Sequence, residues 1–112
     1  MSNLLSLTQN YTKAFNSNNI IKISDFFHKD SVLIDPESPN GIIGHKNIEK
    51  MITELFSNVH SLKFEALNIF IDENNSTSII EFKLNLDTKV FKGVDLIKWQ
   101  EDKILELRAY LY

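Results

Sequence analysis

Three polar residues occupy positions where the sequence pattern calls for apolar side chains. Tyr11 lies on the apolar stripe of an N-terminal helical segment, Asp35 ends a short strand before a proline, and Asp95 lies on the bulkier face of a late strand. A carboxylate near solvent takes a proton from carbon, while a phenol and a neutral carboxylic acid stabilise the oxyanion that forms. Together the three residues indicate enolisation next to a carbonyl group, a reaction that requires neither a metal nor a cofactor.

Each of these residues also has a structural explanation. Tyr11 could be a core tyrosine bonded to a carbonyl, Asp35 a turn-capping aspartate, and Asp95 an acid in contact with water at a sheet edge or a dimer interface. For Asp95, strand alternation places the carboxyl group on the same face as Phe91 and Trp99. Burial among such side chains disfavours the charged form, so we expect Asp95 to have a raised pKa and to donate a hydrogen bond.

Five large apolar residues are candidate walls of a substrate pocket, although each taken singly is better explained as ordinary core: Phe27, Met51, Phe82, Ile97 and Trp99.

Other chemistries have little support. The chain has no cysteine and only three glycines, which excludes thiol chemistry, disulfides and a phosphate-cradling loop. The spacing of His28, His45 and His60 is not that of metal ligands, so no metal site is predicted. The net charge is −3 and Arg108 is the single arginine, which argues against nucleic acid as a partner.

The 112 residues are 43% apolar and 24% charged, an ordinary globular composition. No run of about 18 apolar residues predicts a membrane helix, and no targeting segment is recognisable. We therefore expect a single domain over residues 1–112, located in the cytoplasm, with no membrane partner.

The first half of the chain has helical periodicity. Apolar residues recur at helical spacing over 4–15 and 48–56, and a shorter helix is predicted to begin at Ile20 and end near residues 28–30. Between the last two helices, 32–35 is predicted as a strand and 37–41 as a turn.

After about residue 60 the apolar period changes to two. Strands are expected over 62–71, with a bulge at Ala66–Leu67, and over 80–86 and 90–99. In a last strand, Leu105, Leu107, Ala109 and Leu111 are predicted to share one face. Short turns make these four strands an antiparallel meander, and helices followed by strands indicate an α+β fold.

Several segments resemble the nuclear-transport-factor-2-like (NTF2-like) superfamily, and within it the SnoaL-like and ketosteroid-isomerase branch. They are residues 7–16, 23–30, 34–36, 93–99 and 104–111. The resemblance implies a single SnoaL-like domain with a cone-shaped fold, in which three N-terminal helices pack on a strongly curved antiparallel sheet. It also implies a homodimer paired through the second face of the sheet, which carries Val90, Val94 and Leu96.

The resemblance also implies roles for the three polar residues. In ketosteroid isomerases a first-helix tyrosine and a protonated aspartic acid hold the oxyanion, and an aspartate before a proline moves the proton. Tyr11, Asp95 and Asp35 fall on those positions. Ile52 stands where some members have a supporting second tyrosine, so Tyr11 lacks that neighbour.

The sequence therefore predicts a cofactor-free, ketosteroid-isomerase-like enzyme that transfers a proton next to the carbonyl of a small hydrophobic ketone. This would be an intramolecular oxidoreductase that shifts a C=C bond. The alternative is a non-catalytic small-molecule-binding or dimerisation module of the same fold. Hydrolase or dehydratase chemistry is disfavoured: an epoxide-hydrolysing member would need an arginine between two acids in the cavity, and Arg108 alternates away from the face of Leu107 and Ala109.

Overall fold

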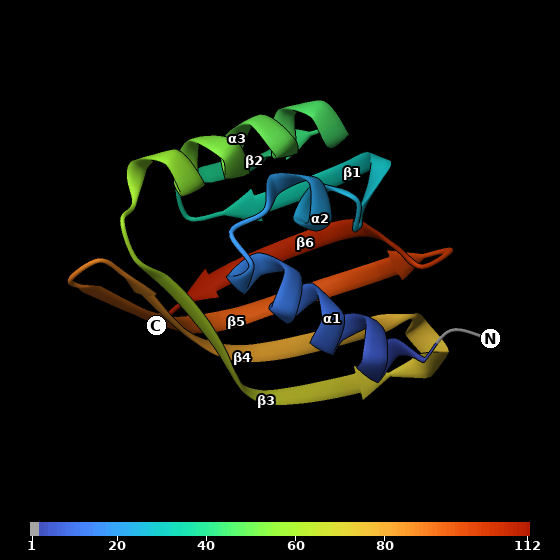
Figure 1. Cartoon of the computed structure of the whole chain (residues 1–112). Coiled ribbons are helices and arrows are strands. Elements are labelled where there is room, and N and C mark those ends of the chain that lie inside the picture. Colours follow the sequence, from blue (N-terminus) through green and yellow to red (C-terminus); the bar gives the residue numbers. More distant parts are fainter. Residues whose placement is uncertain (1–2) are drawn as a thin grey trace.

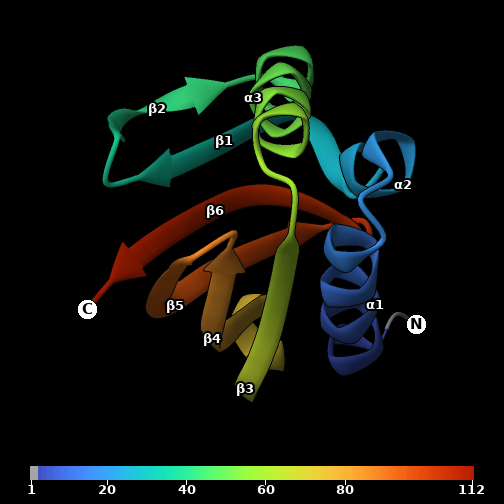
Figure 2. The ribbon, with the colours of Figure 1, turned by 60° about the vertical axis from the view of Figure 1, so that its left-hand side comes forward.

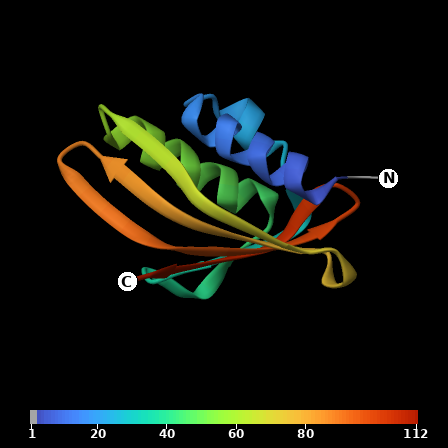
Figure 3. The ribbon, with the colours of Figure 1, turned by 90° about the horizontal axis from the view of Figure 1, so that it is seen from below.

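Three α-helices lie on one face of a curved six-stranded sheet in the computed structural model, which describes residues 3–112 (Figures 1 and 3). The predicted α+β class is confirmed. Along the chain the elements are α1 (Leu4–Asn16), α2 (Ile20–Ser24), β1 (Phe27–Asp35), β2 (Ser38–Ile43), α3 (His45–Asn58), β3 (Leu62–Asp72), the 3₁₀ turn η1 (Glu73–Asn75), β4 (Thr77–Leu86), β5 (Lys89–Gln100) and β6 (Lys103–Leu111).

Both N-terminal helices begin at asparagines that cap them. The Asn3 side chain accepts a hydrogen bond from the backbone N–H of Ser6, and Asn19 accepts from Ile21 and Lys22. These side chains satisfy backbone donors at the helix starts. Helix α1 faces the sheet with its apolar stripe, which includes Tyr11, because that stripe is buried there.

Two predictions in the first half of the chain are wrong. The second helix ends at Ser24, and Phe27 begins β1 because it pairs with Ile104 of β6. The predicted turn over 37–41 is largely strand, since Ser38–Ile43 forms β2 in a hairpin with β1. In both places pairing with a distant or neighbouring strand prevails over local composition.

The strand order is β2-β1-β6-β5-β4-β3 (Figure 2). Strands β3 to β6 form the predicted antiparallel meander, and register shifts at the predicted bulge between Ala66 and Asn68. Strand β1 pairs with β6 in parallel, which joins the two halves of the chain into one sheet. This parallel pair departs from the predicted antiparallel pairing.

A second bulge, at Lys98–Trp99, changes which residues of β6 face the core. Ile104 is fully buried, whereas Leu105, which was predicted to share a face with Leu107, is only half-buried. A bulge shifts the alternation by one residue, and that shift is why the prediction for Leu105 is wrong.

The helices leave the middle of the sheet less covered than its edges. Helix α1 packs mainly on β3 and β4, and α3 packs mainly on β1 and β2. The central strands β5 and β6 therefore lie beneath the space between the two helices. Within residues 3–112, no helix combines the length and apolar character needed to cross a membrane.

Candidate active site

A cavity of about 230 Å³ lies between the concave face of the sheet and helices α1 and α3. Tyr11 contributes from α1, Asp35 from the end of β1 and Asp95 from the middle of β5, so the structure brings the three residues to one cavity. The full lining consists of Tyr11, Phe15, Leu33, Asp35, Pro36, Glu37, Met51, Ile52, Leu55, Phe64, Phe82, Leu84, Leu86, Phe91, Asp95, Leu107, Ala109 and Leu111.

Tyr11 is 4% exposed and is held by aromatic neighbours. Its ring meets Phe26 and Phe27 edge to face, at centroid separations of 5.9 and 6.2 Å. Burial, and to a lesser extent the charge of Asp95, raises the pKa of the Tyr11 hydroxyl well above its ordinary value. The hydroxyl is therefore a protonated donor at any physiological pH.

Asp95 is 5% exposed, and in the sheet it lies between Ile80 of β4 and Ala109 of β6. Burial raises the pKa of its carboxyl group from the ordinary 3.8 to about 7. Among the described residues, none forms a hydrogen bond with this carboxyl group or with the Tyr11 hydroxyl. Neither group is among the fully enclosed side-chain atoms without a partner, which in the described residues comprise only Ser31 Oγ, so both keep access to the cavity and can bond to a ligand there.

Asp35 caps the turn that follows β1. Its Oδ1 accepts a hydrogen bond from the backbone N–H of Glu37 at 3.0 Å, as expected for an aspartate before a turn. It is half-buried and lines the cavity as well, so the capping role and a place in the site coexist. Only one carboxylate oxygen takes part in this hydrogen bond.

The spacing of the two acids follows from the sheet register. Ile34 pairs with Arg108 on β6, so Asp35 lies beside Ala109, which pairs with Asp95 on β5. Asp35 and Asp95 are therefore two strands apart, roughly 10 Å between their backbones. The side chain of Ala109, a single methyl group, lies on the strand between them.

The apolar walls agree with the predicted pocket in part. Met51 and Phe82 line the cavity. Phe27, Ile97 and Trp99, which were also predicted as walls, are instead core residues outside the lining. Alternation identifies the face on which a side chain lies, but it cannot tell at which end of the face a hollow forms.

Some residues that shape the site were missed by sequence reasoning. The sequence pattern places Asn16 in a helix break, but its side chain links α1 to β3 through two hydrogen bonds of 2.7 Å. The side-chain NH₂ group donates to the Phe64 carbonyl oxygen, and the side-chain oxygen accepts from the Phe64 N–H. Gly93 leaves room for the Tyr110 backbone and the Phe82 ring, because a Cβ at Gly93 would overlap the Tyr110 carbonyl oxygen and lie 3.0 Å from the ring. Neither residue carries a local signal for these long-range contacts.

Three acids line the cavity, Asp35, Glu37 and Asp95, and the other charged residues lie outside the lining. Arg108 faces away from the cavity, as predicted, and its guanidinium bonds to Glu106 at 3.2 Å. No lysine, arginine or histidine is found among the lining residues. His45 Nε2 lies 2.8 Å from the Ser24 carbonyl oxygen, and His28 Nδ1 accepts from the Asp30 N–H. In the described part of the chain, no three acidic or histidine side chains are grouped so as to hold a metal ion.

Comparisons with known proteins agree with the fold described above. A model of the SnoaL-like domain matches residues 8–107. No curated protein has a detectably similar sequence. An NTF2-like protein from Cytophaga hutchinsonii superposes with a TM-score of 0.84 at 12% identity, covering 100% of this chain and 92% of that one.

Two further solved structures are those of candidate enzymes. A candidate ketosteroid isomerase from Kribbella flavida has a TM-score of 0.84 at 12% identity, over 97% of this chain and 77% of its own. A candidate SnoaL-like polyketide cyclase from Shewanella putrefaciens has a TM-score of 0.82 at 13% identity, over 99% and 80%. At these identities the likeness shows the fold alone.

Proposed function

The chain belongs to the SnoaL-like family of the NTF2-like superfamily, and we propose that it is a cofactor-free enzyme that transfers a proton next to the carbonyl group of a small hydrophobic ketone. One observation carries the proposal. An apolar cavity holds a buried phenol and a buried carboxylic acid, both without protein hydrogen-bond partners, together with a second carboxylate at the end of β1.

The proposed reaction assigns one role to each residue. The Asp35 carboxylate takes a proton from the carbon next to the carbonyl, and the electron pair of the broken C–H bond moves to the carbonyl oxygen. The Tyr11 hydroxyl and the protonated Asp95 carboxyl group donate hydrogen bonds to the resulting enolate or dienolate. Where the substrate is a β,γ-unsaturated ketone, the dienolate extends to the γ-carbon, and Asp35 returns the proton there, so the net change is a shifted C=C bond.

The proposal implies a pH dependence. With a pKa of about 7, Asp95 is mostly a neutral donor below pH 7 and mostly an anion above it. An anion at this position repels the developing oxyanion instead of stabilising it, so the rate per active site should fall as the pH rises through about 7.

Hydrogen exchange tests the reaction without knowledge of the natural substrate. The α-hydrogens of 2-tetralone, an enolisable two-ring ketone, would be followed by NMR in D₂O with catalytic amounts of protein. We expect exchange in the wild type and a loss of about 10²–10⁴-fold in Asp35→Asn. Asp30→Asn is the matched control, because Asp30 is an exposed acid on the same strand outside the cavity. Wild-type exchange no faster than buffer would refute the proposal.

The alternative function is a ligand-binding module without catalysis. The engagement of Asp35 in a turn cap and the presence of Ile52 in the cavity wall, in place of a supporting tyrosine, favour it. Titration with 2-naphthol tests whether such a module binds through the two donors or through the apolar cavity alone. An assembled pair of donors predicts binding that collapses in both Tyr11→Phe and Asp95→Ala, whereas an apolar cavity alone predicts binding that neither change affects.

We also propose that the convex face of the sheet pairs with a second copy of the chain. Phe70, Val90 and Tyr110 are each more than half exposed, and Leu96 lines a groove of about 490 Å³ on β3 to β5. Apolar surface of this kind favours burial against a partner. Light scattering at micromolar concentration should give the mass of a dimer, and Leu96→Lys should shift the measured mass to that of a monomer.

For the location of the protein we propose the cytoplasm, a reducing compartment suited to a chain without cysteine.

A further inference from the structure

The charges around the cavity are all of one sign. Its lining contains three acids, Asp35, Glu37 and Asp95, and no basic residue. Glu37 is exposed and follows Pro36 in the β1–β2 turn, where its backbone N–H is bonded to Asp35. Glu37 therefore stands at the rim, directly beside the residue proposed to move the proton.

The volume of the cavity limits what it encloses. A protein cavity of about 150 Å³ lined by apolar side chains accommodates benzene, which is about 25 Å³ for each carbon atom. At that ratio, 230 Å³ holds about nine or ten non-hydrogen atoms, the size of two fused rings. Phe64 and Phe82, stacked with centroids 5.2 Å apart, give the wall flat surfaces that suit a planar ring.

Resting on the proposed function, we infer that the substrate is an uncharged carbonyl compound of one or two rings, and that Glu37 at the rim excludes compounds carrying a carboxylate or phosphate. An anionic group that reached the rim would meet the carboxylates of Asp35 and Glu37, with no lining cation to offset them. Repulsion by charges a few ångströms away in a partly desolvated rim corresponds to a tenfold or larger loss of affinity.

Three related phenols test the inference by fluorescence titration at about pH 6. They are 2-naphthol, 6-hydroxy-2-naphthamide and 6-hydroxy-2-naphthoate, of which the last two have nearly the same shape and differ by one charge. In the wild type we expect the naphthoate to bind at least tenfold more weakly than the naphthamide. Glu37→Gln should narrow this ratio at least threefold. The control Glu54→Gln, an exposed acid of α3 outside the lining, should leave it unchanged.

Equal affinities for the naphthoate and the naphthamide would overturn the inference, and so would a ratio that Glu37→Gln leaves unchanged. A wild type that binds none of the three would overturn it too, since it predicts binding of the neutral probes. A four-ring phenol should bind with no more than about threefold higher affinity than 2-naphthol, because its extra rings stay in water. An affinity more than about tenfold higher would contradict a ligand of one or two rings.

The outcomes separate this inference from the proposed reaction. Charge-selective binding without α-hydrogen exchange of 2-tetralone would refute the reaction and leave the ligand class standing. Exchange by a protein that does not distinguish the naphthoate from the naphthamide would support the reaction and refute the selection by Glu37.

Discussion

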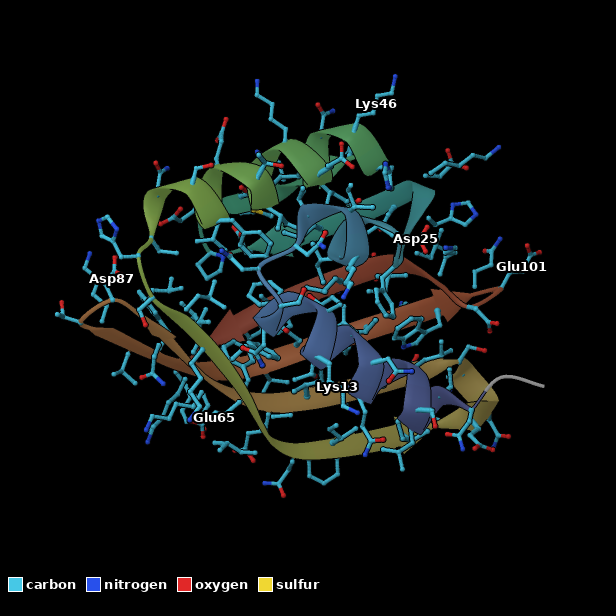
Figure 4. All side chains as sticks on the ribbon, viewed as in Figure 1. Lys13, Asp25, Lys46, Glu65, Asp87 and Glu101 are labelled. Carbon is cyan, nitrogen blue, oxygen red and sulfur yellow. The ribbon has the colours of Figure 1, made fainter. Side chains whose placement is uncertain are left out.

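The two ends of the concave face are built from the same strands, yet one is solid and the other hollow. They lie towards opposite tips of the sheet, the hollow end towards Asp87 in the β4–β5 turn and the solid end towards Glu101 in the β5–β6 turn (Figure 4). On β5, Asp95 lines the cavity, whereas Ile97 and Trp99, two and four residues further on, are packed in the core.

The difference lies in what covers the strands. At the solid end, Phe26 packs against Trp99, whose indole N–H donates to Ser78 Oγ at 2.9 Å. Helices α1 and α3 pack mainly on the outer strands, and the cavity lies over the part of the central β5 and β6 that carries Asp95 and Ala109. The buried side chains of β5 alternate without a break from one end to the other, so on this strand the hollow depends on where the helices lie and not on a change in the strand pattern.

The largest expected effect is the loss of unfolding free energy when Phe27 is replaced, which we compare with the loss when Phe91 is replaced. Phe27 is 4% exposed in the solid end, and Phe91 is a half-buried wall of the cavity. Phe27→Ala should lower the free energy of unfolding by about 3–5 kcal/mol, because it opens a new void in close-packed core. Phe91→Ala should cost about half as much, since one side of its ring already faces empty space. Urea unfolding measures both, and equal losses would mean that the two ends are packed alike.

Replacing Asp95 tests the electrostatic character of the hollow end. The folded protein holds the Asp95 proton more tightly than the unfolded chain, so the wild type loses stability as the pH rises from about 4 to about 7. Asp95→Asn removes this loss. Its free energy of unfolding relative to wild type should rise across that window, by up to about 4 kcal/mol, and stay level above pH 7. Thermal unfolding at several pH values measures the difference, with exposed Asp30→Asn as control; a difference independent of pH would contradict a buried, neutral Asp95.

Asn16 tests what holds α1 over the cavity. Asn16→Ala removes both bonds to the Phe64 backbone and should cost about 1–3 kcal/mol of unfolding free energy. It should also weaken 2-naphthol binding, because Tyr11 lies on the same helix. Asn47→Ala, which removes a single exposed bond to the Ile43 carbonyl, is the control and should change stability by less than about 0.5 kcal/mol. If both variants behaved alike, α1 would not depend on this contact.

A small effect on stability but a large one on binding is expected at Ala109, between the two acids. Ala109→Leu should fill part of the cavity and lower 2-naphthol affinity about tenfold or more, while unfolding free energy changes by less than about 1 kcal/mol because the added atoms enter empty space. Tyr110→Leu, on the exposed convex side of the same strand, should leave 2-naphthol affinity unchanged. Tight binding by Ala109→Leu would place the ligand elsewhere.

The sequence by itself determined the interior-facing stripe of α1 and the interior face of β5. Apolar spacing identified the stripe of α1 that carries Tyr11 and the face of β5 that carries Asp95, because side-chain direction follows directly from the period of a helix or a strand. It also identified the bulge near Ala66 and the outward direction of Arg108. These are local properties of the chain.

Only the tertiary structure decided how the elements meet. The parallel pairing of β1 with β6 extends β1 back to Phe27, sets Asp35 beside Ala109, and thereby places the two acids on one cavity. The position of the hollow, the exclusion of Phe27, Ile97 and Trp99 from its lining, and the bridge from Asn16 to β3 depend on the same long-range packing. Such contacts join residues far apart in the chain, and no local period records them.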